Sequence, residues 1–210
     1  DDYLDDFFFT PGYDEVMGAS REGGRGVVVN LDARRKIAEL PLPGMPHLGS
    51  GISWRWAGES GKDTPRTVIA TPNLNQGLIS VIDLKDWKLL KSIPTAGPGF
   101  FLRSHEKTRY AWTDSMMSKE AKNTLQVIDK TTLEVVAKLR AEPGKTLAHI
   151  EFTKNGKYAL ASLWERKTDG GAIIVYDADT LQEVKRIPMD KPVGKYNLHN
   201  KITRSEGTSH

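Results

Sequence analysis

Residues Leu78 to Thr95 read LISVIDLKDWKLLKSIPT and combine two runs of alternating apolar residues with a polar turn that begins at Asp83. Alternation with a period of two residues is typical of a half-buried strand, and an aspartate before a polar turn can bond the backbone N–H groups of that turn. The segment therefore predicts an antiparallel hairpin. The same pattern recurs in three further segments, Gly26–Pro43, Thr124–Ala141 and Ala172–Met189. Their turn aspartates are Asp32, Asp129 and Asp177, so the repeat is about 48 residues long.

A second hairpin precedes each of these repeats, and Asn155-Gly156 is the strongest turn signal among them. Each unit then holds four antiparallel strands in about 48 residues, which is typical of a β-propeller blade. No segment shows the 3.6-residue period of a helical repeat. We expect an all-β fold, a β-propeller whose four-stranded antiparallel blades span residues 5–42, 48–95, 99–141 and 147–189, with one more closing strand at 194–204.

The closing strand bears on how complete the ring is. A trailing strand normally completes a blade begun at the N-terminus, but the first blade here already has its own inner strand at Asp6–Thr10. We therefore expect further blades upstream, with residues 1–210 forming the C-terminal arc of a larger ring. Such an arc exposes blade faces and strand edges, which favours aggregation.

Composition excludes several kinds of chemistry. The 210 residues are 38% hydrophobic and carry a formal charge of only +3, without a basic stripe interleaved with aromatics, so we expect no nucleic-acid partner. No apolar run approaches the roughly 20 residues of a membrane span. The absence of cysteine excludes disulfides, thiolate zinc sites, a cysteine nucleophile and covalent c-type haem attachment within this chain.

Blade topology collects the candidate functional residues on one face of the disc. His47 lies there in LPGMPHLGSG, residues 42–51, a connection between blades that is rich in proline and glycine. His105 falls in a turn on the opposite face, and we expect it to be a surface residue. The candidates on the first face are His47, Asn73, Phe101, His149, Trp164, Lys195 and Tyr196.

These residue types suit redox and proton-transfer chemistry. Imidazole can ligate iron or move a proton near neutral pH, and a phenol can donate a hydrogen bond or a proton. Structural interpretations remain for each of them: His149 as a buried, hydrogen-bonded histidine and Trp164 as blade packing. From the residues alone, a redox enzyme and a non-catalytic propeller that binds a partner on its loop face are both open.

Several segments resemble one known family. GMPHLGSGISW (44–54), FLRSHEKTRYAWTD (101–114), IEFTKNGKYALASLW (150–164) and KPVGKYNLHNKITRSEGTSH (191–210) are similar to the C-terminal half of the haem d1 domain of cytochrome cd1 proteins. The resemblance implies an eight-bladed propeller with haem d1 across its axis. It also implies a missing N-terminal part with the remaining blades, the proximal iron ligand and, in most members, a domain that carries haem c.

Within that family, the nitrite reductases place two histidines over haem d1. His47 matches the first, but Asn73 stands at the second position, and an amide cannot donate a proton as imidazolium does. The chain therefore looks more like the dihydro-haem d1 dehydrogenases of haem d1 biosynthesis in denitrification, with nitrite reduction to nitric oxide as the alternative.

The resemblance also assigns roles and surroundings. It makes His47 the iron ligand or acid/base, Tyr196 a catalytic residue, and Phe101 and Trp164 flat walls against the macrocycle. Asn73, His149 and Lys195 would line the pocket. It implies a periplasmic protein with a c-type cytochrome or similar electron partner, and a possible homodimer at full length.

Overall fold

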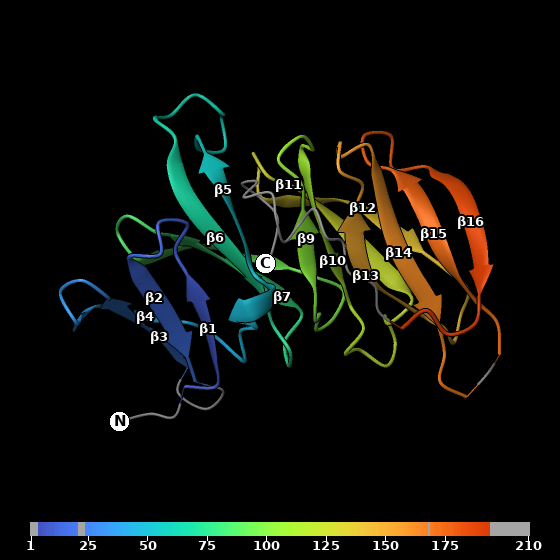
Figure 1. Cartoon of the computed structure of the whole chain (residues 1–210), viewed down its shortest axis with the longest axis horizontal. Coiled ribbons are helices and arrows are strands. Elements are labelled where there is room, and N and C mark those ends of the chain that lie inside the picture. The colour runs from blue at the N-terminus through green and yellow to red at the C-terminus, as the bar shows by residue number, and fades with distance from the viewer. Residues whose placement is uncertain (1–3, 21–23, 168, 194–210) are drawn as a thin grey trace.

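The computed structural model of the chain describes residues 4–20, 24–167 and 169–193, which form four antiparallel sheets placed side by side in an arc (Figure 1). Blade 1 contains β1 (Asp6–Phe9), β2 (Glu15–Ala19), β3 (Arg25–Asn30) and β4 (Arg35–Pro41). Blade 2 contains β5 (Ile52–Trp56), β6 (Arg66–Pro72), β7 (Leu78–Asp83) and β8 (Lys88–Pro94). Blade 3 contains β9 (Leu102–Ser104), β10 (Tyr110–Asp114), β11 (Thr124–Asp129) and β12 (Glu134–Arg140). Blade 4 contains β13 (Thr146–Phe152), β14 (Tyr158–Trp164), β15 (Gly171–Asp177) and β16 (Glu183–Met189).

Within each blade the strands pair in chain order, so every connection is an antiparallel reversal. This confirms the predicted all-β fold of four-stranded blades. The first strand of a blade lies innermost, since β5 contacts β9 and β9 contacts β13 across the blade boundaries. The predicted closing strand at 194–204 lies outside the described residues.

The hairpin between the third and fourth strands is built alike in all four blades. Asp83, Asp129 and Asp177 each accept hydrogen bonds from backbone N–H groups two or three residues later. In blade 1 this place belongs to Asn30, whose Oδ1 accepts from the N–H of Ala33 at 2.8 Å. The prediction that Asp32 caps this turn was therefore wrong.

A left-handed residue fixes the position of that cap. The residues four places after Asn30, Asp83, Asp129 and Asp177 are Arg34, Trp87, Leu133 and Leu181, and all four have φ between 49° and 63°. A bulge also precedes each cap by the same spacing. Because Asn and Asp have the same hydrogen-bonding oxygen, the turn accepts either residue.

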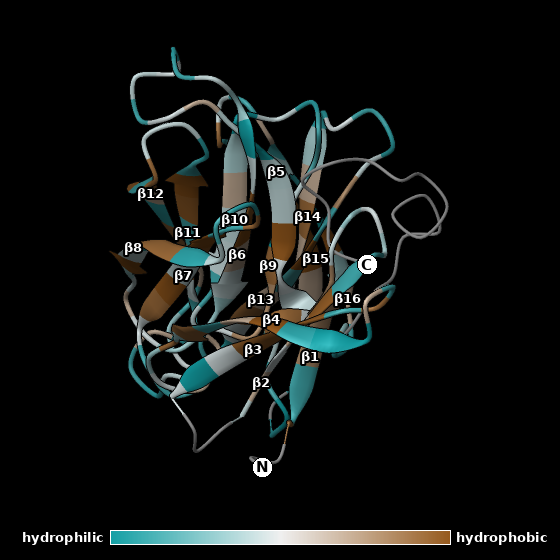
Figure 2. Ribbon diagram, turned by 90° about the vertical axis from the view of Figure 1, so that its left-hand side faces the viewer, coloured by the Kyte–Doolittle hydropathy of each residue, from teal (hydrophilic) through white to brown (hydrophobic). Residues whose placement is uncertain are grey.

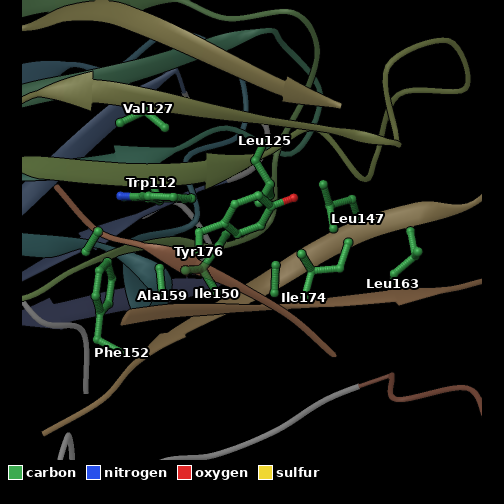
Figure 3. Packing of buried hydrophobic residues seen from close by; sticks show 12 residues of the cluster. Trp112, Leu125, Val127, Leu147, Ile150, Phe152, Ala159, Leu163, Ile174 and Tyr176 are labelled. Carbon is green, nitrogen blue, oxygen red and sulfur yellow. The ribbon is translucent and has the colours of Figure 1, made fainter. Parts of the chain in front are cut away.

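The hydrophobic core is divided into three clusters, one between each pair of neighbouring blades. Between blades 3 and 4, Trp112 packs against Phe152 and Tyr176, with ring centroids 6.4 and 5.6 Å apart (Figure 3). Figure 2, seen from the blade 1 end, shows apolar stretches on interior strands such as β5 and β11. Packing between blades therefore holds the arc together.

The two ends of the arc differ from its interior. On blade 1, Phe7, Phe9 and Tyr13 are 58%, 37% and 54% exposed, and the Phe9 ring contacts the other two. On blade 4, every residue of β16 is exposed. The end blades thus present apolar side chains that neighbouring blades cover elsewhere, and the expected aggregation of the isolated arc stays a prediction.

Candidate functional site

The loop that carries His47 is tied to blade 2 by backbone pairing. The His47 N–H donates to the carbonyl of Pro72 at 2.8 Å, and Pro46 forms an antiparallel bridge with Asn73. Gly44 has φ of +68°, and a Cβ there would lie 2.7 Å from the Asn73 amide. Glycine is therefore required at this turn, both for its backbone conformation and for the close approach of Asn73.

Asn73 itself is buried and serves this loop. Its Oδ1 accepts from the N–H groups of Met45, Asn75 and Gln76 at 3.1, 3.2 and 2.9 Å. Its Nδ2 donates to the carbonyl of Pro43 at 2.8 Å. The amide thus fixes the loop that presents His47, and all its hydrogen bonds within the described residues go to backbone.

The His47 imidazole has one nitrogen fixed and the other available. Nδ1 lies 2.8 Å from the carbonyl oxygen of Phe100, and because a carbonyl can only accept, Nδ1 carries the proton. In the neutral ring the lone pair is then on Nε2, which has no hydrogen-bond partner among the described residues. A histidine that donates through one nitrogen to a backbone carbonyl and keeps the other basic has the usual arrangement of a metal ligand.

A row of rings continues from His47 across blade 3. Phe100 contacts His47 edge-on with centroids 4.3 Å apart, and Phe101 lies 4.7 Å further on. The two phenylalanines are held by Asp114, whose carboxylate accepts from the N–H groups of both at 2.9 Å. Full burial raises the pKa of Asp114 although these N–H donors, and Arg103 nearby, act in the opposite direction.

His149 ends this row from blade 4. Its ring stacks on Phe101 with centroids 4.4 Å apart and an interplanar angle of 13°. The register between β13 and β14 shifts between Ala148 and Glu151, and His149 has φ of +55°. A bulge re-aims a side chain out of the strand alternation, so the inner strand of blade 4 turns His149 towards blade 3.

Two buried charged residues complete the cluster. The Glu151 carboxylate lies 3.8 Å from His149 Nε2 and 3.6 Å from Arg103 Nε. The Arg103 guanidinium also lies over the Phe101 ring, 5.3 Å from its centroid. We did not predict Phe100, Arg103, Asp114 and Glu151 as site residues from the sequence. Two features of the sequence pointed to them: the double phenylalanine after Gly97-Pro98-Gly99, and charged residues within otherwise apolar strands.

The structure brings three of the predicted site residues into one continuous row, His47, Phe101 and His149, with Phe100 between the first two. Trp164 is buried at the end of β14, opposite Thr146, and its indole Nε1 has no hydrogen-bond partner among the described residues. Lys195 and Tyr196 lie outside the described residues.

His105 was predicted to be a surface residue, and this was wrong. Only 4% of it is exposed. Its Nδ1 accepts from the Lys107 N–H at 3.1 Å and its Nε2 lies 3.2 Å from the Lys154 carbonyl, so the ring joins the turns of blades 3 and 4. Burial lowers the pKa of His105, which favours the neutral ring.

Cavities also lie at the other end of the blades, where the turns within the first and second hairpins of each blade are found; we call this the turn end. These cavities are separate from the row of rings that begins at His47. One of about 570 Å³ lies between the turns of blades 1 and 2 and is lined by Arg55, Arg66 and Asp83. Another of about 370 Å³ lies between blades 2 and 3, against Trp54 and Lys130. No helix in the described part of the chain is long and apolar enough to cross a membrane.

The fold and the row of rings define the class of the protein. Four-stranded blades arranged around an axis form a β-propeller, and flat aromatic rings beside an imidazole with a basic nitrogen suit a planar metal macrocycle. The family described as Cytochrome D1 heme domain matches residues 1–201, and the chain belongs to this family. The predicted resemblance to the haem d1 domain is thereby confirmed.

Relatives within the family refine this assignment. The chain is 54% identical to the dihydro-heme d1 dehydrogenase of Pseudomonas aeruginosa over 209 residues, which cover 100% of the chain and 40% of the relative. It is 27% identical to the nitrite reductase of Stutzerimonas stutzeri over 88% of the chain and 37% of that protein. The chain therefore spans well under half the length of these relatives.

Solved structures agree with this order of similarity. The dihydro-heme d1 dehydrogenase NirN, in complex with DHE, superposes with a TM-score of 0.86 at 53% identity over 96% of the chain and 41% of that structure. The β-propeller domain of Myceliophteria thermophila Cps50 (Swd1) superposes with a TM-score of 0.58 at 14% identity over 89% of the chain and 57% of that structure, which supports the fold alone.

Proposed function

We propose that this chain is the C-terminal part of a dihydro-haem d1 dehydrogenase. We further propose that the face of the blades that carries His47, here called the axial face or axial end, binds dihydro-haem d1 as substrate. The observation that carries the proposal is the continuous row from His47 through Phe100 and Phe101 to His149. The 54% identity to a dihydro-heme d1 dehydrogenase over the whole chain supports the same activity.

The residues present fit a planar iron macrocycle. His47 would hold the iron of such a ring through Nε2, and Phe100 and Phe101 would supply the flat apolar neighbours of the ring. It brings its own nitrogen ligands for the iron. The described residues accordingly need no cluster of three or more metal-ligating side chains, and none was found among them.

Each residue of the proposed site has a separate role in the oxidation of the dihydro compound. Converting a dihydro compound into its dehydrogenated product removes two electrons and two protons. The iron, when bound, supplies one-electron redox chemistry. His47 would hold the iron macrocycle, the phenylalanines would keep water from it, and His149 would accept a proton, because imidazole is basic near neutral pH. Tyr196, predicted from the sequence, is the second proton-transfer group.

The test is oxidation of dihydro-haem d1 followed optically in the whole protein that contains this chain. We expect turnover by the wild type and losses of about 10²–10⁴-fold in kcat for His149→Ala and Tyr196→Phe, the usual effect of removing a general acid or base. Glu134→Gln, at an exposed position on β12, is the control. Rapid nitrite turnover by the wild type without oxidation of the dihydro compound would contradict the proposal.

Nitrite reduction is the less favoured candidate. It would need a second protonated donor beside His47, and the amide of Asn73 is engaged by the backbone of Pro43, Met45, Asn75 and Gln76. Asn73→His would both remove these bonds and place imidazole in the loop. We expect nitrite turnover by the wild type to be slow.

The remaining parts of the proposal rest on the length and identity of the relatives. Because the chain covers 40% of the dihydro-heme d1 dehydrogenase, the whole protein would complete an eight-bladed ring and supply the proximal iron ligand and a haem c domain. It would act in the periplasm during denitrification, pass electrons to a c-type cytochrome or similar partner, and could form a homodimer. A C-x-x-C-H motif in the upstream sequence would support the haem c assignment.

A further inference from the structure

We infer that Glu151, held in place by Arg103, is a positioning residue that orients the His149 imidazole and compensates the charge this ring gains when it accepts a proton. The inference rests on the proposed function, because it assigns a partner to the proposed proton acceptor. It concerns a carboxylate and a guanidinium that the reaction does not otherwise use.

Burial is the first reason for this assignment. Side-chain exposure is 8% for Arg103, 9% for Glu151 and 2% for His149. Charged groups in such surroundings persist only when they compensate one another, because removing an isolated charge from water is strongly unfavourable. The Glu151 carboxylate therefore compensates the charge of the Arg103 guanidinium and can also compensate a charge on the His149 imidazole.

Geometry is the second reason. The Glu151 Oε1 atom lies 3.6 Å from Arg103 Nε and 3.8 Å from His149 Nε2. One carboxylate oxygen therefore faces both the guanidinium and the imidazole. These separations are ion-pair distances and exceed a normal hydrogen bond. Contacts of this kind commonly shorten when substrate binds. One face of the imidazole is covered by Phe101, which in turn lies under the Arg103 guanidinium.

Backbone placement is the third reason. The bulge between Ala148 and Glu151 and the positive φ of His149 break the strand alternation. In a regular strand, residues two apart such as 149 and 151 point to the same face. Here the two side chains remain at an ion-pair distance across the bulge while the His149 ring stacks on Phe101 of blade 3, and Arg103 comes from the neighbouring inner strand β9.

Charge balance explains what the arrangement achieves. Arg103, Glu151 and neutral His149 sum to zero, so protonation of the ring would leave one net positive charge. Other ionisable groups near the row are Asp114, at the end of β10 and close to Arg103, and His47 on the loop beyond Phe100. With Glu151 ionised, the protonated ring has an adjacent carboxylate, as in the orienting carboxylate of hydrolase triads.

The experiment compares Glu151→Gln and Glu151→Asp in the whole protein, with Glu134→Gln as a control at an exposed site. We expect Glu151→Gln to lower kcat for dihydro-haem d1 oxidation about 10–100-fold, with KM changed less than about twofold. The pH–rate profile should lose the limb assigned to His149 or shift it to lower pH, because the adjacent negative charge is gone. Glu151→Asp should restore part of the rate.

A second measurement is independent of activity. Imidazole ¹⁵N NMR of the protein without ligand should show that the His149 ring keeps its second proton to higher pH in the wild type than in Glu151→Gln. The inference fails if both kcat and this titration are unchanged. It also fails if kcat falls equally at every pH without rescue by aspartate, since that result indicates a structural role. If the wild type does not oxidise dihydro-haem d1 at all, the proposed function fails, and the titration still decides the role of Glu151.

Discussion

Histidines lie near both ends of the short inner strand β9, and their surroundings differ. At one end, the His105 ring contacts the backbone of two turns through both nitrogens, so the ring closes the structure. At the other end, Phe101 stacks on His149 and contacts Phe100. Phe100 in turn contacts His47, whose Nε2 makes no hydrogen bond within the described residues. The difference teaches that burial of a histidine does not identify a site. His47 and His105 differ instead in whether the second ring nitrogen has a hydrogen-bond partner among the described residues.

The largest expected effect is at the turn end. Gly156 has φ of +72°, and a Cβ there would lie 2.5 Å from His105 Nδ1. We expect Gly156→Val to destabilise the protein by about 3 kcal/mol or more through backbone strain and overpacking. Gly144→Val is the matched control, because Gly144 also has positive φ (+85°) but no atom within 4 Å of the added Cβ. Urea unfolding of both variants measures the difference, and equal losses would contradict the contact with His105.

Asp114 accepts hydrogen bonds from the N–H groups of Phe100 and Phe101, so its substitution measures how much this anchor stabilises the axial end. Asp114→Asn keeps one acceptor oxygen but turns the amide nitrogen towards a backbone donor, so we expect a loss of about 1–3 kcal/mol. Burial raises the pKa of Asp114, so the native state holds its proton to higher pH than the unfolded state. Stability from this group is therefore present below about pH 3.9 and is lost as the pH rises through the raised native value.

The corresponding measurement is the unfolding free energy of wild type and Asp114→Asn at several pH values. The advantage of the wild type should shrink as the pH rises above about 4. An advantage that grows with pH would show that the N–H donors of Phe100 and Phe101 outweigh burial.

His105→Gln should have a smaller effect, about 1–2 kcal/mol, because hydrogen bonds to two turns are lost. Burial lowers the pKa of His105, so the unfolded state binds the proton more readily. This contribution to stability is complete above about pH 6.5 and is lost as the pH falls below it. His105→Gln should therefore flatten the acid side of the stability profile, as thermal melts between pH 5 and pH 8 can show. An unchanged profile would remove the structural role given to the ring.

The smallest effect distinguishes two neighbouring residues of one turn. Asn30→Ala should cost about 1 kcal/mol, since its side chain caps the turn. Asp32→Ala should change stability by less than about 0.5 kcal/mol, as expected for an exposed residue without such a role. The reverse order would restore Asp32 as the cap.

The hairpins could be predicted because their information is local: alternation, an Asx residue and a turn lie within about 18 residues of each other. The error at Asp32 arose because Asn and Asp cap equally well, and only the bulge and the left-handed Arg34 decide between them. Strand topology also placed His47, Phe101 and His149 on one face.

The remainder of the site depends on contacts between blades. The backbone carbonyl of Phe100 accepts the hydrogen bond from His47 Nδ1–H, and no side-chain pattern encodes this contact. Arg103 and Glu151 stand on the inner strands of different blades, so their contact depends on how blades 3 and 4 pack together. His105 was misplaced for the same reason, since the carbonyl of Lys154 that covers it belongs to the next blade.

We propose that the iron macrocycle binds through His47 at the axial end of the inner strands and not at the turn end. The most direct measurement is the absorption spectrum of the whole protein titrated with haem d1, for wild type, His47→Ala and His105→Gln. We predict that His47→Ala changes the position of the ligand bands, whereas His105→Gln binds with the wild-type spectrum despite its lower stability. A wild-type spectrum for His47→Ala, or a changed spectrum for His105→Gln alone, would contradict the account.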